Sequence, residues 1–241
     1  MLVQADASQL EWRTLLELSR DEVGINEVLN NEDAHSLNQQ AFDLPSRLIA
    51  KIYLFRTIFR GTGWSFAHDP DFMHVSTDPR FWDDIGVKFY TKYHGIDKTH
   101  KRWADCVLSG QPIVGPLGRS WSISLVEGKR GEMKLPMPTL TNYPVQGTGA
   151  DIMMLARLMA YNRIKKLKIL CVFVSTVHDS IVVDTPKENV QIVVDVFHQV
   201  FADLIPNIKK NFGYEWLVPM SCETKIGMNM KDMKKIQPSW A

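Results

Sequence analysis

The chain has 241 residues, of which 45% are hydrophobic and 23% charged, and its net charge is +1. This length accommodates one large domain or two small ones, and the composition is ordinary for a soluble globular protein. Three cysteines without CxxC spacing exclude a zinc–cysteine site and a disulfide framework, and they fit a reducing cytoplasm. We expect no signal peptide, because Gln4 and Asp6 interrupt the N-terminus, and no apolar run is long enough to span a bilayer.

Apolar periodicity and turn residues predict a mixture of helices and short strands. In the first half we expect a strand over 2–5 ending in Asp6, helices over 9–19, from His35 and over 46–60, and a loop-rich connection over 61–86 with a short helix near 78–86. Then follow a helix over 87–108, a β-hairpin within 110–135, a long helix over 145–167, a β-rich run over 169–184, a helix over 187–204 and a strand over 216–226.

Two aspartates stand at strand ends. The run VFVSTVHDSIVVD is β-branched on both sides of His178 and Asp179, so its flanks should pair as a hairpin with these two residues at the tip. Asp6 ends the strand LVQAD, where a carboxylate is costly unless a cation, water or hydrogen bond satisfies it. If the two strands are neighbours, both acids could bind two Mg²⁺ ions, which would activate a hydroxyl and stabilise a leaving oxygen. The alternative is that each aspartate caps a turn or a helix.

A second cluster follows one side of the helix predicted over 46–60. Its members recur at four-residue spacing: Arg47, Lys51, Phe55 and Phe59. Arg47 and Lys51 could straddle a triphosphate, and Phe55 would offer an apolar surface to a base or sugar. His35, at the start of the preceding helix, could donate a further hydrogen bond to phosphate. The alternative is a solvated amphipathic helix with its aromatic residues in the core.

Four longer segments are distinctive: DASQLEWR, DAHSLNQQAFDLPSRLIAKIYLFRTIFRG, TNYPVQGTGADIMMLA and VHDSIVVD. In this order they resemble the first palm motif, the fingers helix with its lead-in, the NxPxQGTAAD segment and the VHDE motif of family-A DNA polymerases. The DxHxxNQ…LPxR…K pattern is particularly similar to that of bacteriophage replicative members. Several motifs in the family's order cover nearly the whole chain, so chance similarity is a poor explanation.

The resemblance implies an α+β fold with a palm sheet and a helical fingers subdomain. Residues 1–20 would form the first part of the palm, 21–110 the fingers, and 111–241 the rest of the palm with its central helix, catalytic hairpin and C-terminal strand. The segments that the family places upstream, including the thumb and any exonuclease domain, have no counterpart in this sequence. We therefore expect a partner, an N-terminal polymerase polypeptide that carries the thumb and perhaps an exonuclease.

The resemblance also implies roles for single residues. Asp6 and Asp179 would be the catalytic metal ligands, with the backbone carbonyl of Ala7 as a further ligand. Glu11 corresponds to a sugar gate that occupies the place of a ribose 2′-hydroxyl. The triphosphate-binding positions fall on His35, Arg47 and Lys51, and the nucleotide-stacking position falls on Phe55. Positions that touch the template or primer fall on Phe59, Asn142, Gln146 and His178.

Several positions depart from the family pattern. Ser180 replaces the acid that usually follows the second catalytic aspartate, and Pro138 stands where many relatives have an arginine. Arg56 and Arg60 replace residues that are commonly glycine, and they lie either in solvent or against nucleic-acid phosphates. Activity, template-side packing and fidelity could each be altered by these replacements.

Taken together, the residues and the resemblance predict a DNA-directed DNA polymerase subunit that adds dNTPs to a primer 3′-hydroxyl on primer–template DNA. The expected cofactor is a pair of Mg²⁺ ions, and the expected location is the cytoplasm, of an infected host cell if a phage encodes the chain. Two alternatives stay open: a non-catalytic fragment that binds DNA or a partner, and a two-metal nuclease. A nuclease would not need the helix that reads a triphosphate.

Overall fold

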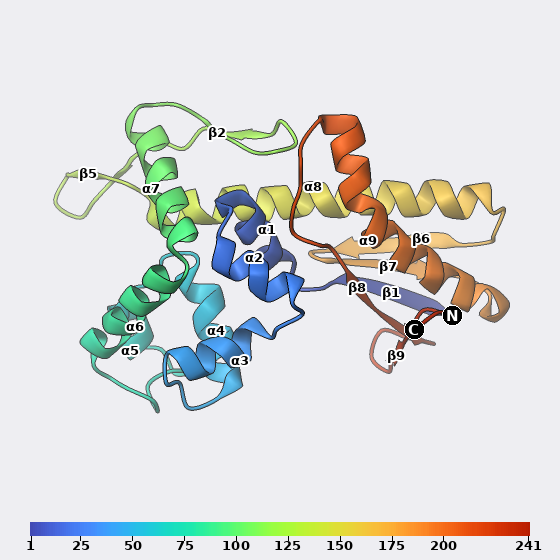
Figure 1. The fold of residues 1–241 in the computed structure, drawn as a ribbon, viewed down its shortest axis with the longest axis horizontal. Helices are drawn as coiled ribbons and strands as arrows, with labels where there is room; N and C mark the ends of the chain where they lie inside the picture. Colours follow the sequence, from blue (N-terminus) through green and yellow to red (C-terminus); the bar gives the residue numbers. More distant parts are fainter. The chain divides into compact units, whose positions relative to one another are not determined.

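The computed structural model describes residues 1–241, which form two compact units (Figure 1). The sheet unit comprises Met1–Arg13 and Gly147–Ala241, and the helical unit comprises Thr14–Gln146. These limits differ from the expected boundaries after residues 20 and 110, and the assignment of palm and fingers to the units stays a prediction. No helix has both the length and the apolar character needed to cross a membrane.

The sheet unit is built on five strands whose neighbours are all antiparallel, in the order β6-β7-β1-β8-β9. The strands are β1 (Leu2–Ala7), β6 (Val172–Val177), β7 (Ser180–Asp184), β8 (Cys222–Gly227) and β9 (Lys234–Ile236). The central strand β1 alternates along its length, because Val3, Ala5 and Ala7 are buried while their neighbours are partly exposed. The expected strands at the N-terminus and around residue 179 are therefore confirmed.

Helix α9 (Val190–Phe212) packs against β1 and β8 and closes one side of the core. A short 3₁₀ turn, Lys187–Asn189, precedes it, and Gly213 ends it in the left-handed conformation at φ 67°. The helix is longer than the expected 187–204, because Leu204 and Ile208 extend its buried side past Pro206. Helix α8 (Met137–Lys166) likewise starts earlier than expected.

The helical unit contains most of the helices. They are α1 (Leu10–Ser19, which begins in the sheet unit), α2 (Glu22–Leu29), α3 (Ala34–Ala41), α4 (Arg47–Thr57), α5 (Gly63–Ala67), α6 (Pro79–Lys92) and α7 (His94–Leu108). Two small hairpins follow, β2–β3 (Ile113–Val114 with Ser120–Trp121) and β4–β5 (Val126–Glu127 with Met133–Lys134). The single hairpin expected within 110–135 is thus replaced by two.

Aromatic side chains fill the core beneath α4. The Phe66 ring lies 4.8 Å from Tyr53, 5.1 Å from Phe72 and 5.6 Å from Trp82, measured between ring centroids. All four side chains are almost fully buried. Contacts of this kind add to the free energy gained by burying large aromatic surfaces. They fix the buried side of α4 and leave Arg47 and Lys51 exposed on the other side.

Two expectations for this unit were wrong. The helix expected over 87–108 is interrupted at Tyr93, whose hydroxyl lies 2.8 Å from a Glu27 carboxylate oxygen and 2.9 Å from the Asn38 side-chain oxygen. These partners are distant in sequence, so local periodicity gave no sign of the break. Helices α2 and α5 form where the sequence analysis expected no helix, α5 within the connection expected to be loop-rich.

Candidate active site

The sheet unit brings Asp6 and Asp179 together. In the β1–β7 pairing Asp6 lies opposite Ser180, and the Ala7 N–H donates a hydrogen bond to the Asp179 carbonyl oxygen at 2.8 Å. Asp179 occupies the two-residue turn between β6 and β7. Strand β1, which carries Asp6, and strand β7, which follows Asp179, are thus neighbours in one sheet, which meets the condition that the metal-site hypothesis set.

The negative charges of Asp6 and Asp179 repel each other, which affects the pKa of Asp6. Burial raises the pKa of Asp6 above its ordinary value, and the charge of Asp179 raises it further. Lys225 opposes this effect, while Glu223 adds a small contribution in the same direction as Asp179. Next to Asp6, burial and the nearby carboxylate raise the pKa of the Cys222 thiol to about 12. That thiol therefore stays protonated at neutral pH and adds no further negative charge.

The donor set fits a hard divalent cation. Two carboxylates and the Ala7 backbone carbonyl offer oxygen ligands, which Mg²⁺ prefers, and Mg²⁺ commonly keeps several of its waters. The repulsion between Asp6 and Asp179 is the kind of cost that a bound cation would relieve. No group of three or more His, Cys, Asp or Glu side chains forms a complete metal cluster in the chain. Water or substrate oxygens would have to complete the coordination.

The turn that carries Asp179 has a defined conformation. His178 adopts a left-handed φ of 51° and is exposed. Ser180 is buried, and its hydroxyl donates to the Val177 carbonyl oxygen at 3.1 Å. Ser180 thus closes the turn and presents no carboxylate beside Asp179.

Helix α4 presents two cations on its exposed side. Ser46 caps its N-terminus by accepting a hydrogen bond from the Ile49 N–H. The opposite side of the helix is buried through Ile49, Ala50, Tyr53, Leu54 and Thr57. Arg47 and Lys51 are exposed, and Phe55 is half-buried. The helix is therefore amphipathic, as both interpretations of its sequence required.

His35 lies beside this helix. Its side chain is 3% exposed, its ring centroid is 5.9 Å from that of Phe55, and its Nδ1 atom has no hydrogen-bond partner. Burial lowers the pKa of His35; Asp33 raises it, while Arg47 and Lys51 lower it further. The structure thus gathers His35, Arg47, Lys51 and Phe55 in one place, with a neutral imidazole among them.

Asp33 is a member of this cluster to which the sequence analysis gave no role. Its carboxylate accepts hydrogen bonds from Arg47 Nε at 2.6 Å and Arg47 Nη2 at 3.0 Å, and it caps α3 through the Ser36 N–H. The hydrogen bond to Arg47 holds the pKa of Asp33 well below its ordinary value. The Asp-x-x-Ser spacing was a visible capping signal, but nothing in the sequence indicated the pairing with Arg47.

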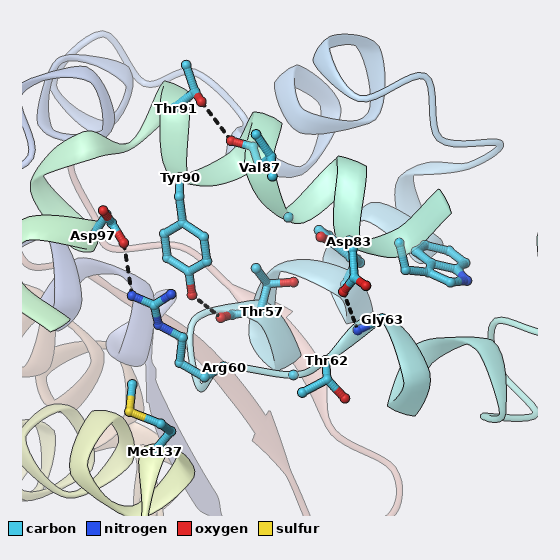
Figure 2. Close-up of a pocket in the computed structure, with 14 residues that line it drawn as sticks. Thr57, Arg60, Thr62, Gly63, Asp83, Val87, Tyr90, Thr91, Asp97 and Met137 are labelled. Carbon is cyan, nitrogen blue, oxygen red and sulfur yellow. Dashed lines mark hydrogen bonds and ion pairs between the residues drawn. The ribbon is translucent and has the colours of Figure 1, made fainter. Parts of the chain in front are cut away.

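The two arginines that stand in place of glycine are both occupied within the unit. Arg56 pairs with Asp69 and, at 3.3 Å, with Asp71. Arg60 pairs with Asp97 at 2.9 Å and lies 4.2 Å from the centroid of the Tyr90 ring (Figure 2). Neither guanidinium is simply solvated, because each pairs with at least one carboxylate of the chain itself, and contact with nucleic-acid phosphates stays a prediction.

Arg60 and Tyr90 line a cavity of about 680 Å³ behind the C-terminal end of α4. The Tyr90 hydroxyl donates to the Thr57 carbonyl oxygen at 2.7 Å, and Asp83 accepts from the Gly63 N–H at 2.9 Å (Figure 2). Arg60 holds a left-handed φ of 61°, a conformation that glycine adopts more readily. The last turn of α4 is thus tied to α6 and α7 by a polar network.

The remaining predicted residues lie on three elements. Glu11 is half-buried in the first turn of α1. Asn142 and Gln146 lie within α8, which continues through Pro144, so neither is a helix cap. Phe59 follows the end of α4 and is half-buried. Their roles toward DNA and nucleotide stay predictions.

A sequence profile of DNA polymerase family A matches residues 1–232. The chain belongs to DNA polymerase family A. DNA polymerase I of Caldicellulosiruptor bescii is 24% identical over 245 residues, which cover 97% of this chain and 27% of that protein. The DNA polymerase of Bacillus phage SP01 is 23% identical over 253 residues, which cover 96% of this chain and 26% of that protein. These similar identities do not set phage members apart, so a particular closeness to them stays a prediction.

The fold of this family-A chain is similar to a solved structure described as the POL domain of Pol1 from M. smegmatis in complex with DNA primer-template and dNTP. The TM-score is 0.76 and the identity 19%, and the match covers 94% of this chain and 39% of that chain. The expected α+β polymerase fold is thus confirmed. The chain spans about a quarter of the length of the two curated relatives named above.

Proposed function

We propose that this family-A chain supplies the catalytic palm and fingers of a DNA-directed DNA polymerase. Each turnover would be a template-directed nucleotidyl transfer, in which the primer 3′-hydroxyl attacks the α-phosphate of a dNTP and pyrophosphate leaves. The observation that carries this proposal is the meeting of Asp6 and Asp179 at adjoining strand ends, in a chain of this family. The helix with Arg47 and Lys51 supports it, because that helix suits a triphosphate substrate.

In this proposal Asp6, Asp179 and the Ala7 carbonyl hold two Mg²⁺ ions. When bound, the ions activate the attacking hydroxyl and neutralise charge on the leaving group. The protein's own contribution is a pair of carboxylates whose mutual repulsion favours cation binding. The protonated Cys222 thiol beside Asp6 leaves these oxygens as the hard ligands of the site.

The nucleotide would be held by the cluster around α4. Arg47 offers a planar fork of donors to phosphate oxygens, and Lys51 offers a compact charge. His35 is neutral because burial lowers its pKa, so it would act as a hydrogen-bond donor rather than as a third cation. Phe55 would stack on the incoming nucleotide, and Glu11 would exclude a ribose 2′-hydroxyl. Primer and template would contact Phe59, Asn142, Gln146 and His178.

We further propose that an N-terminal polymerase polypeptide, carrying the thumb and the rest of the palm, associates with the sheet unit. Strand β6 lies at the edge of the sheet, where Val172, Val174 and Val177 are 58, 55 and 51% exposed. The Tyr161 ring on α8 lies 5.8 Å from Phe173 on β6, so the apolar surface continues from the strand onto the helix. An open apolar strand edge pairs readily with another chain.

A primer-extension assay tests the activity. The chain, alone and mixed with a candidate N-terminal polypeptide, would be given a labelled primer–template, four dNTPs and Mg²⁺. The proposal requires extension by the mixture that depends on Asp6 and on Asp179. DNA binding without extension would favour a non-catalytic fragment, and degradation of the primer without synthesis would favour a nuclease.

A further inference from the structure

A second cationic site lies in the helical unit, on elements other than α3 and α4. A pocket of about 290 Å³ opens between the end of α1, the start of α2 and helix α7. Its wall includes the charged residues Arg20, Glu22, Lys98 and Arg102, together with His94. Three of them, His94, Lys98 and Arg102, are exposed and follow one side of α7 at four-residue spacing.

This arrangement is costly in the absence of an anion. Like charges four residues apart on a helix, as Lys98 and Arg102 are, repel each other. No ion pair within 4 Å neutralises Lys98 or Arg102, whereas the neighbouring Lys101 pairs with Asp97 at 2.6 Å. Arg20 pairs with Glu17 at 2.9 Å and holds a left-handed φ of 52°. Glu22 is the one acid in the pocket wall, so the positive charges outnumber it.

The walls of the pocket are fixed by a buried carboxylate. Asp21 accepts hydrogen bonds from the Gly24 N–H at 2.9 Å and from the Gly95 N–H at 2.7 Å, which joins the first turns of α2 and α7. Gly95 is needed at this contact, because a Cβ atom there would lie 2.8 Å from the Asp21 Cα. The spacing between Arg20 and the α7 cations is therefore set by the fold and is ready before a ligand arrives.

We propose that this pocket binds a backbone phosphate of single-stranded DNA. An arginine fork and a lysine point charge are the groups that suit phosphate oxygens. A pocket of this size lies at the lower limit for enclosing a whole small molecule, and an open site suits one phosphate of a longer strand. The choice of DNA as the source rests on the proposed polymerase function. The site would add a nonspecific electrostatic contact outside the nucleotide and metal sites.

The test measures binding of a fluorescently labelled oligothymidylate to the full chain by anisotropy at several salt concentrations. The double variant Lys98→Gln/Arg102→Gln is compared with Lys88→Gln/Lys101→Gln, which removes the same charge from exposed positions of α6 and α7 outside the pocket wall. Each lost phosphate contact lowers the slope of log affinity against log salt by about 0.7 for a single strand. The proposal concerns one phosphate, so we expect the first variant to lose about 0.7 from this slope and the control to keep it.

Equal slopes in the two variants, or no binding by the wild-type chain, would overturn the inference. A second arm uses inorganic pyrophosphate alone. If pyrophosphate raises the melting temperature of the wild type but not of Lys98→Gln/Arg102→Gln, while the DNA slopes are equal, the site takes a free anion and the assignment to DNA is wrong. The polymerase proposal is judged separately by primer extension, because neither variant alters Asp6, Asp179 or the α4 cluster.

Discussion

Asp33 and Arg47 form a bidentate ion pair in which two guanidinium nitrogens lie 2.6 and 3.0 Å from the two carboxylate oxygens. The pair joins the start of α3 to the start of α4, 14 residues further along the chain. If Arg47 binds a triphosphate, its pair with Asp33 must loosen, because the Asp33 carboxylate and the phosphate oxygens would accept hydrogen bonds from the same guanidinium N–H groups. Asp33 would then compete with the nucleotide for Arg47.

Replacing Asp33 by Asn should therefore release Arg47 while keeping the α3 cap, since Asn also caps helices. We expect triphosphate binding, measured by titration calorimetry with a dNTP and Mg²⁺, to tighten about two- to fivefold, because exposed ion pairs are weak. The lowered pKa of Asp33 means that its ionised form stabilises the fold above its unfolded pKa of about 4 and loses this effect as the pH falls further. The melting temperature of Asp33→Asn should thus fall less steeply in acid. Unchanged dNTP affinity would show that the pair does not restrain Arg47.

Asp6→Asn and Asp179→Asn should abolish nucleotide addition with little change in fold, since each removes a metal ligand without removing volume. The pKa of Asp6 is raised, so its ionised form opposes folding; this cost is absent at pH values below the unfolded pKa and complete above the folded one. Without Mg²⁺, either variant should therefore melt slightly above the wild type at neutral pH. Addition of Mg²⁺ should raise the melting temperature of the wild type only. Primer extension at the normal rate by either variant would contradict the assignment.

Lys51→Ala should weaken nucleotide use in the reconstituted enzyme. Loss of a charged phosphate contact costs about 2–4 kcal/mol of transition-state stabilisation, read from kcat/KM. Lys88→Ala, which removes an exposed lysine of α6, is the matched control and should leave kcat/KM unchanged.

Sugar selectivity gives a separate test. Phe55→Tyr on α4 should increase acceptance of dideoxynucleotides, and Glu11→Ala on α1 should admit ribonucleotides. Unchanged dideoxynucleotide acceptance in Phe55→Tyr would mean that α4 does not face the nucleotide, and continued exclusion of ribonucleotides by Glu11→Ala would mean that Glu11 is not the sugar gate.

At Arg60, substitutions should separate backbone strain from side-chain contacts. Arg60→Ala and Arg60→Gly both lose the pair with Asp97 and the contact with the Tyr90 ring. Only glycine gains freedom at φ 61°, so Arg60→Gly should unfold with a free energy about 1 kcal/mol higher than Arg60→Ala. Urea denaturation gives both values. Equal stabilities would argue against strain at this position.

Two helical glycines should respond in opposite ways to alanine. Gly95→Ala should destabilise the helical unit by about 1–3 kcal/mol, because the new Cβ would lie 2.8 Å from the Asp21 backbone. In Gly86→Ala the nearest atom would be the Tyr53 hydroxyl oxygen at 3.8 Å, so the better helix propensity of alanine should stabilise α6 by about 0.5–1 kcal/mol. Chemical denaturation of both variants provides the comparison. A neutral Gly95→Ala would show that the α2–α7 contact is loose.

Sequence patterns identified the strands and the residues that meet on them, because β-branched runs and a polar turn between them have a direct local signature. That is why the hairpin with Asp179 at its tip and the strand ending at Asp6 could be predicted, whereas the pairing of β1 with β7 was only a condition of the metal-site hypothesis. Four-residue spacing likewise placed Arg47, Lys51 and Phe55 on one side of α4. These features depend on residues close together in the chain.

The features that escaped prediction depend on distant partners. The break at Tyr93 is held by Glu27 and Asn38, and no local residue marks it. Helix α2 contains Gly24, a residue unfavourable for helices, yet a Cβ there would lie 2.2 Å from a methyl carbon of Leu16. In both cases tertiary packing decided the local structure.

The alkylation rate of Cys222 can be used to follow local opening of the sheet near Asp6. Only the thiolate reacts readily with alkylating reagents, and a pKa of about 12 leaves very little thiolate at neutral pH. The side chain is also buried beside Asp6, so a reagent can reach it only when this part of the sheet opens. The rate at which Cys222 is alkylated therefore measures how often the sheet opens next to Asp6. Slower labelling in Mg²⁺ would reveal that cation binding holds the sheet closed, in a measurement that requires neither DNA nor a partner chain.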